Sequence, residues 1–161
     1  MAYLKRKEPV SVYNAGVSSD TIALAKARIA TDVTPKFIAG ADNICVIYLG
    51  TNDLDQGANA TTVIASLTDL ISTIKGLGWK VAVLTLANLF NPYIDDENLV
   101  NGYIATINSW IMTNTNIDFK IDLNTRLKDS ATGLSNRQYV RVYDGVHFSS
   151  PAQRIIATTV S

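Results

Sequence analysis

The sequence predicts an α/β fold with a mostly parallel sheet and helices on both of its faces. Short apolar runs rich in β-branched residues alternate along the chain with longer amphipathic stretches, which is the pattern of βαβ units. Two of these runs, Ile44–Leu49 and Val81–Leu86, are almost continuously apolar, as expected of strands that a parallel sheet buries on both faces. Polar loops follow the predicted strands, at the edge of the sheet where such folds hold their active sites.

The first third of the chain predicts one strand and two helices. Val10–Tyr13 is a short apolar and aromatic run that ends in a polar loop, as a strand does. Ser19 and Asp20 are residue types that cap helices, and they precede a helical pattern over residues 21–30. A proline then interrupts the pattern, so a second, short helix is expected over residues 35–41.

The rest of the chain repeats the alternation. The predicted strands are Ile44–Leu49, Val81–Leu86 and Phe119–Leu123, and the predicted helices are Thr61–Lys75, Glu97–Met112 and Ser150–Thr159. The apolar faces of the first two of these helices are Val63, Leu67, Leu70, Ile71 and Ile74, and then Leu99, Tyr103, Ile107 and Ile111. No repeat, linker or low-complexity stretch interrupts this order. We therefore expect a single domain over residues 1–161.

The composition excludes several classes of partner. The chain carries 14 basic and 14 acidic residues, and only 17% of its residues are charged. Such a balance provides no basic surface for nucleic acid. No apolar run approaches the ~18 residues of a membrane span, and no signal-peptide pattern is present. We expect no nucleic-acid partner and no membrane span, and the sequence indicates no compartment; its single cysteine, Cys45, cannot form an internal disulfide.

The only histidine of the chain, His147, is a candidate general base. Asp144 lies three residues earlier with Gly145 between them, so a tight turn brings the carboxylate to one ring nitrogen. The carboxylate would then fix the tautomer and stabilise the imidazolium, leaving the other nitrogen to move a proton. The alternative interpretation is that Asp144 and Gly145 simply form a surface turn.

Asn52 is a candidate oxyanion donor. It follows Gly50 and Thr51 directly after a predicted buried strand. A side-chain amide held at that strand end can donate a hydrogen bond to a developing oxyanion, an interaction typically worth ~3 to 4 kcal/mol of barrier. The alternative is that Asn52 and Asp53 cap the loop before the next helix.

Three polar loops together resemble the SGNH (GDSL-type) serine esterases. The segments are Asn14-Ala15-Gly16-Val17-Ser18-Ser19-Asp20-Thr21, Gly50-Thr51-Asn52-Asp53 and Asp144-Gly145-Val146-His147, which are similar in order and spacing to the second, third and fifth sequence blocks of that family. The resemblance extends over almost the whole chain. It implies a three-layer α/β/α sandwich of flavodoxin-like architecture, and serine-dependent hydrolysis of esters without a cofactor or a metal.

The resemblance also implies a role for each matching residue. His147 would be the base and Asp144 its orienting partner, while Asn52 would supply the side-chain oxyanion donor. Ser19 stands where many members have glycine, and its backbone N–H would be a further oxyanion donor. The expected substrate is an ester of a carbohydrate or of another small molecule, by analogy with the family alone.

The first block of the family, Gly-Asp-Ser, supplies the nucleophilic serine, and this tripeptide does not occur in the sequence. Residues 2–7 resemble the end of the helix that follows that block, so the chain is expected to begin after the family's first strand. That strand would lie between Val10–Tyr13 and Ile44–Leu49. Three explanations remain open: an N-terminally truncated sequence, a partner chain or swapped segment that completes the sheet, or a domain that has lost catalysis and serves as a glycan-binding or structural module of a larger assembly.

Two serines within the sequence are weaker candidates for the nucleophile. Ser130 follows an aspartate, but it lies in a polar stretch far beyond the third block. Ser18 follows a predicted strand and precedes a helix, as in the Gly-x-Ser-x-Gly elbow of α/β-hydrolases. Asp20 replaces the final glycine of that motif, and the elbow would leave the Gly-Thr-Asn-Asp block unexplained.

Overall fold

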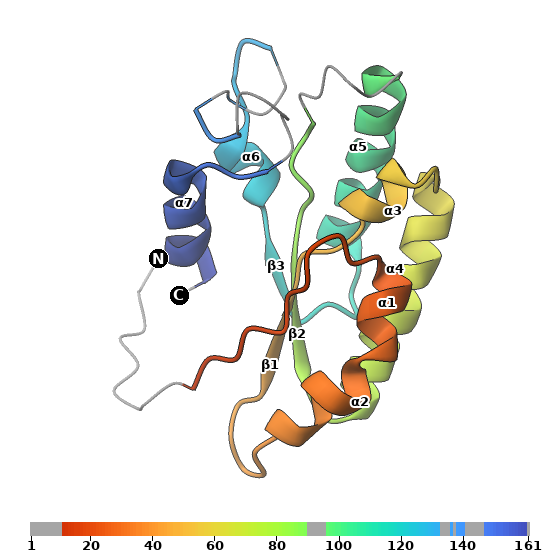
Figure 1. Cartoon of the computed structure of the whole chain (residues 1–161), viewed down its shortest axis with the longest axis vertical. Coiled ribbons are helices and arrows are strands. Elements are labelled where there is room, and N and C mark those ends of the chain that lie inside the picture. Colours follow the sequence, from red (N-terminus) through yellow and green to blue (C-terminus); the bar gives the residue numbers. More distant parts are fainter. Residues whose placement is uncertain (1–10, 90–95, 133–135, 137, 141–146, 161) are drawn as a thin grey trace.

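A computed structural model describes residues 11–89, 96–132, 136, 138–140 and 147–160 of the chain. Three parallel strands form an open sheet in the order β1 (Ile44–Ile47), β2 (Lys80–Leu84) and β3 (Phe119–Ile121). Helices cover both faces, as Figure 1 shows, so the predicted three-layer α/β/α class is confirmed.

The register of the sheet determines which backbone groups of β1 face outward. Ile44 lies opposite Lys80, and the Lys80 N–H donates to the Asn43 carbonyl at 2.9 Å. In a parallel ladder alternate residues of a strand bond to the same neighbour, so the odd-numbered residues of β1 face β2. The N–H and C=O groups of Ile44 and Val46 therefore point to the outer edge, where no strand among the described residues pairs with them.

One face of the sheet is covered by the helices that precede β3 in the chain. These elements are α1 (Ile22–Ala27), α2 (Ile29–Asp32), α3 (Thr51–Asp55), α4 (Ala60–Gly76) and α5 (Glu97–Thr113), with a 3-10 helix at Thr34–Lys36. Their apolar side chains pack with Val81 and Val83 of β2 in the larger core cluster. The predicted apolar face of α4 is buried at all five positions.

The other face is covered by α6 (Leu123–Leu127) and α7 (Ser150–Val160), on the left of the sheet in Figure 1. A smaller core cluster forms there around Leu84 of β2, with Leu123, Leu127 and Ala152 fully or almost fully buried. Strand β2 thus has apolar side chains packed on both of its faces, as the continuous apolar run predicted.

One predicted strand does not form, and the burial predicted for another was wrong. Residues 11–13 form no strand, and Val12 and Tyr13 are exposed. A strand needs a neighbour for its backbone hydrogen bonds, and none of the described strands reaches these residues. Ile44–Leu49 was expected to be buried on both faces, but Val46 is 53% exposed because the smaller cluster packs over β2 and β3.

Helix boundaries also differ from the prediction in detail. Thr21, and not Ser19 or Asp20, caps α1 by accepting from the Leu24 N–H. The predicted helix over residues 21–30 is interrupted at Arg28, which separates α1 from α2. The short helices α3 and α6 were not predicted, and Leu99, assigned to the apolar face of α5, is 49% exposed.

Candidate active site

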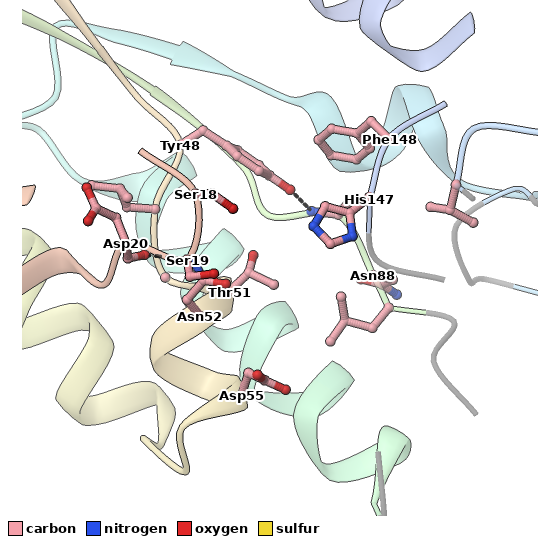
Figure 2. A pocket seen from close by; sticks show the side chains of 15 residues that line it. Ser18, Ser19, Asp20, Tyr48, Thr51, Asn52, Asp55, Asn88, His147 and Phe148 are labelled. Carbon is pink, nitrogen blue, oxygen red and sulfur yellow. Dashed lines mark hydrogen bonds between the residues drawn. The ribbon is translucent and has the colours of Figure 1, made fainter. Parts of the chain in front are cut away.

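A pocket of about 490 Å³ opens at the carboxyl ends of β1 and β2. Its walls come from Ser18, Ser19 and Asp20, from the segment 48–52, from Asp55, from the segment 87–89, and from Val140, His147 and Phe148. Figure 2 shows His147 on one side of this pocket, with Ser18, Ser19 and Asn52 on the other. Three of the four predicted site residues, distant in sequence, therefore line one cavity.

The fourth predicted residue, Asp144, lies outside the described residues. His147 is the first described residue after it and has an exposed side chain at the pocket wall. Its neighbour Phe148 forms an antiparallel bridge with Val140, and the Phe148 ring lies 5.6 Å from the ring of Tyr48. The second contact attaches the chain next to His147 to the residue that follows β1.

The segment before α1 forms a tight turn that exposes Ser19. The Asp20 N–H donates to the Val17 carbonyl at 3.4 Å, which closes the turn. Ser19 is its third residue and has a φ of 64°, the left-handed conformation that glycine adopts without strain. The structure thus explains why a glycine suits this position.

Asp20 is buried, and its side chain is held by an ion pair. Its carboxylate forms an ion pair with Arg28, which also pairs with Asp32. The Arg28 guanidinium further donates to the Ala15 carbonyl, at 3.3 and 3.4 Å from its two terminal nitrogens. Hydrogen bonding to Asp20 is the main reason that the pKa of Arg28 lies above its ordinary value.

Asn52 connects the third-block segment to this turn. It lies in α3, half-buried, and its Nδ2 donates to the backbone carbonyl of Asp20 at 2.7 Å. The N-cap residue of α3, Gly50, has a φ of 125°, and a Cβ there would come within 3.1 Å of the Val63 side chain. Glycine at that position lets α3 start directly at the end of β1, beside the pocket.

Asp53 contacts α1 and does not cap the helix that follows it. Its carboxylate oxygens accept from the Ile22 N–H at 3.3 and 3.2 Å. Burial raises the pKa of Asp53, and the Ile22 hydrogen bond opposes that increase. The alternative interpretation was that Asn52 and Asp53 cap the loop before the next helix, but their side chains bond to Asp20 and Ile22 instead, and Asn59 caps α4.

Sequence reasoning missed Tyr48, which follows β1 and lines the pocket. The Ala87 N–H donates to its hydroxyl at 3.5 Å. Burial raises the pKa of Tyr48 to about 12, so the phenol stays neutral at physiological pH. Its position at the end of a predicted strand was the available signal, but an aromatic residue there is equally typical of core packing.

Side-chain amides hold the pocket wall that continues β2. Beyond the strand end, the Leu86 N–H donates to Asn108 Oδ1 at 2.7 Å and the Leu86 carbonyl accepts from Nδ2 at 2.8 Å. Asn101 makes the same pair of bonds with Leu89, at 2.9 and 3.1 Å. An extended segment without a neighbouring strand thereby keeps its polar groups satisfied, and it presents Asn88 and Leu89 to the pocket.

The chemistry available in the pocket is proton transfer and hydrogen bonding. The described residues contain no cluster of three metal-ligating side chains. Within the same residues, no helix has the length and apolarity to cross a membrane. Of the serines considered above, Ser18 lines the pocket and Ser130 does not.

Solved structures with the same fold include several acylhydrolases. The chain resembles a candidate acylhydrolase from Bacteroides fragilis (TM-score 0.72, 20% identity, covering 88% of this chain and 68% of that chain). It also resembles a GDSL-like lipase from Bacteroides thetaiotaomicron (TM-score 0.68, 20% identity, covering 89% of this chain and 70% of that chain). A third is the acetyl xylan esterase AlAXEase (TM-score 0.67, 21% identity, covering 91% of this chain and 77% of that chain).

No curated protein sequence matches the chain. The sequence model of the GDSL-like lipase/acylhydrolase family matches residues 1–155, nearly the whole length. This match confirms the resemblance that the three polar loops indicated. The chain belongs to the GDSL-like lipase/acylhydrolase family.

Proposed function

We propose that this domain hydrolyses small acyl esters, with His147 as the general base. The observation that carries the proposal is the gathering of Ser19, Asn52 and His147 around one pocket, from three separate segments of the chain. A base on one wall and hydrogen-bond donors on the opposite wall are what acyl transfer needs, because the tetrahedral oxyanion and the proton relay lie on different sides of the reacting carbon.

Each residue has a defined role in this proposal. His147 takes the proton of the attacking hydroxyl and returns it to the leaving alcohol, with Asp144 orienting its ring. The Asn52 amide uses one N–H on the Asp20 carbonyl, which leaves its second N–H for the oxyanion. The backbone N–H of Ser19, exposed in the turn, is the other donor.

The nucleophile is proposed to be the serine of a Gly-Asp-Ser segment that is not part of the printed sequence. The outward N–H and C=O groups of Ile44 and Val46 support this, because a strand added in parallel there would end beside the pocket. The segment can belong to the same polypeptide or to a partner chain. Ser18 is the second candidate, since it already lines the pocket.

The proposed substrate is an acetyl or similarly small ester of a carbohydrate. The pocket wall combines the apolar side chains of Leu49, Leu89 and Phe148 with the polar Asn88 and Asp55. Apolar groups can hold a short acyl chain while amide and carboxylate groups bond to hydroxyls. The fold shared with an acetyl xylan esterase adds an analogy to this argument.

Labelling with a fluorophosphonate probe, followed by peptide mapping, tests the proposal. The printed chain should remain unlabelled, whereas a version extended upstream through the reading frame should be labelled at the Gly-Asp-Ser serine. His147→Ala should abolish that labelling, because the probe needs an activated hydroxyl. Labelling at Ser18 would reassign the nucleophile, and no labelling of either form would leave a serine supplied by a partner chain or a non-catalytic glycan-binding module.

A further inference from the structure

The two proposed oxyanion donors are joined through one buried residue, Asp20. Its backbone carbonyl accepts from the Asn52 amide at 2.7 Å, and its own N–H closes the turn that exposes Ser19. The orientation of both donors therefore depends on where Asp20 is held. Neither of these bonds involves the Asp20 side chain, which leaves the carboxylate to a separate anchor.

Arg28 is that anchor among the described residues. Asp20 is only 8% exposed, and a carboxylate so placed is costly unless a cation pairs with it. Arg28 provides the pairing from the junction between α1 and α2, where its planar guanidinium spans two carboxylates and one carbonyl. The carbonyl belongs to Ala15, which precedes the turn, so Arg28 contacts the chain both before and after Ser19.

Arg28 does not line the pocket and cannot touch a substrate there. Any effect on catalysis must pass through the turn that it holds. The helix is interrupted at Arg28, which is the C-cap of α1 and the N-cap of α2. This interruption places the Arg28 side chain beside the turn. A lysine could satisfy one carboxylate, but it lacks the fork that reaches all three acceptors.

We propose that Arg28 is a positioning residue, which orients the Asn52 amide and the Ser19 N–H through its contacts with Asp20 and Ala15. The inference rests on the proposed function for its catalytic consequence. The positioning itself is a property of the folded chain and can be measured without catalysis.

The first experiment follows the Asn52 side-chain amide by NMR in the wild-type chain and in Arg28→Gln. The amide resonances should shift and their solvent exchange should become at least about tenfold faster, since the Asp20 carbonyl is no longer held. Two control variants leave the turn contacts in place. Lys26→Gln removes an ion pair between α1 and Asp69 of α4, and Asp32→Asn removes the other carboxylate partner of Arg28.

Unchanged Asn52 resonances in Arg28→Gln, with the fold intact by thermal unfolding, would overturn the proposal whether or not the domain is an esterase. If Arg28→Gln does not fold, Arg28→Lys takes its place. It keeps the charge facing Asp20 and loses the reach to Ala15, so an intermediate shift is expected. A wild-type spectrum in that variant would equally contradict the proposal.

The second experiment measures hydrolysis of p-nitrophenyl acetate by the active form of the domain. Arg28→Gln should lower kcat by about 10- to 100-fold, as small displacements of reacting groups do, while KM changes little. In an Asn52→Ala background the same substitution should have a smaller effect than in the wild type, because one of the two donors that Arg28 orients is already removed. An effect as large as in the wild-type background would overturn the coupling of Arg28 to Asn52. Absence of hydrolysis in the wild type would refute the proposed function alone and leave the NMR result to decide the positioning.

Discussion

Ser19 combines a strained backbone with a proposed catalytic position. Its φ of 64° places a non-glycine residue in the left-handed region, which costs L-residues roughly 1–2 kcal/mol. The turn over residues 17–20 keeps this conformation because Asp20 is held on both sides, by Arg28 and by Asn52. The strain is therefore supported by bonds made at the next residue.

Substitutions at Ser19 should separate backbone strain from side-chain loss. We predict that Ser19→Gly leaves the free energy of unfolding equal or raises it by up to about 1 kcal/mol. Ser19→Val should lower it by more than about 1 kcal/mol, because a β-branched side chain fits this region poorly. Urea denaturation measures both. The same pair at Ser18, whose φ is not positive, serves as the control, and equal stability of the two Ser19 variants would contradict the strain.

At the residue scale, the proposed site could be predicted only in part. Asn52 was identified because it follows a strand end, where parallel sheets gather polar residues. His147 was identified as the only histidine, three residues after Asp144, and the role of Ser19 came from the resemblance to the family. The bond from Asn52 to Asp20 and the ion pair of Asp20 with Arg28 could not be read from the sequence. They depend on how a helix breaks and a turn closes, which are tertiary outcomes.

Asp118 connects elements at the amino ends of β2 and β3, away from the carboxyl ends where the pocket opens. Its carboxylate accepts from the Val81 N–H of β2 at 2.9 Å and from Lys75 of α4 at 2.9 and 3.1 Å. The Val81 bond first, and Lys75 next, hold the pKa of Asp118 below its ordinary value. Because the folded-state pKa is the lower one, this stabilisation is complete above about pH 4 and is lost as the pH falls through the folded-state pKa.

We predict that Asp118→Asn lowers the free energy of unfolding at pH 7 by about 1 kcal/mol, since one charge-assisted bond is lost. The variant should also show a flatter decrease of stability between about pH 4 and pH 2 than the wild type. Urea denaturation over a pH series tests both statements. Asp69→Asn, which removes an exposed ion pair, is the control, and an Asp118→Asn deficit that is as large at pH 2 as at pH 7 would contradict the assignment.

At the element scale, periodicity predicted some segments well and others not at all. Helix α4 was predicted almost to its ends, because its apolar face repeats over four turns and Asn59 caps it. Helix α6 was not predicted, and its first residue, Leu123, was assigned to the strand before it. The signals were present in Asp122, which accepts from the Thr125 N–H, and in the buried pair Leu123 and Leu127, but five residues are too few for a helical period to stand out.

At the scale of the whole molecule, the described strands leave the outer edge of β1 unpaired. Val46 is 53% exposed, and the outward backbone groups of β1 have no partner strand among the described residues. The sequence of β1, Ile44–Ile47, contains no charge and no proline, the residues that usually protect an edge strand. An apolar, unprotected edge favours association of one copy with another.

We predict that Val46→Lys slows aggregation of the isolated chain and changes the free energy of unfolding by less than about 0.5 kcal/mol, as expected at an exposed position. Static light scattering over time measures the first quantity and urea denaturation the second. Val12→Lys adds the same charge at an exposed residue outside the sheet and should protect less. Equal protection by both variants would attribute the effect to net charge, and a large loss of stability would show that Val46 is buried in solution.

At this scale the fold class could be predicted because alternation of apolar runs and helical patterns defines a parallel α/β sheet. What the pattern could not predict was which strands find neighbours. Val10–Tyr13 has the local composition of a strand, yet residues 11–13 pair with none of the described strands. Strand formation is decided by a partner that local composition does not contain.

Hydrolysis of p-nitrophenyl acetate by the domain and its His147→Ala variant tests the central claim most directly. It is measured with the chain as printed and with a version extended upstream through the reading frame. The account predicts that the form carrying the Gly-Asp-Ser serine hydrolyses the ester and that His147→Ala lowers the rate by about 10³-fold or more, with the fold intact. Hydrolysis at the wild-type rate in the His147→Ala variant would contradict it.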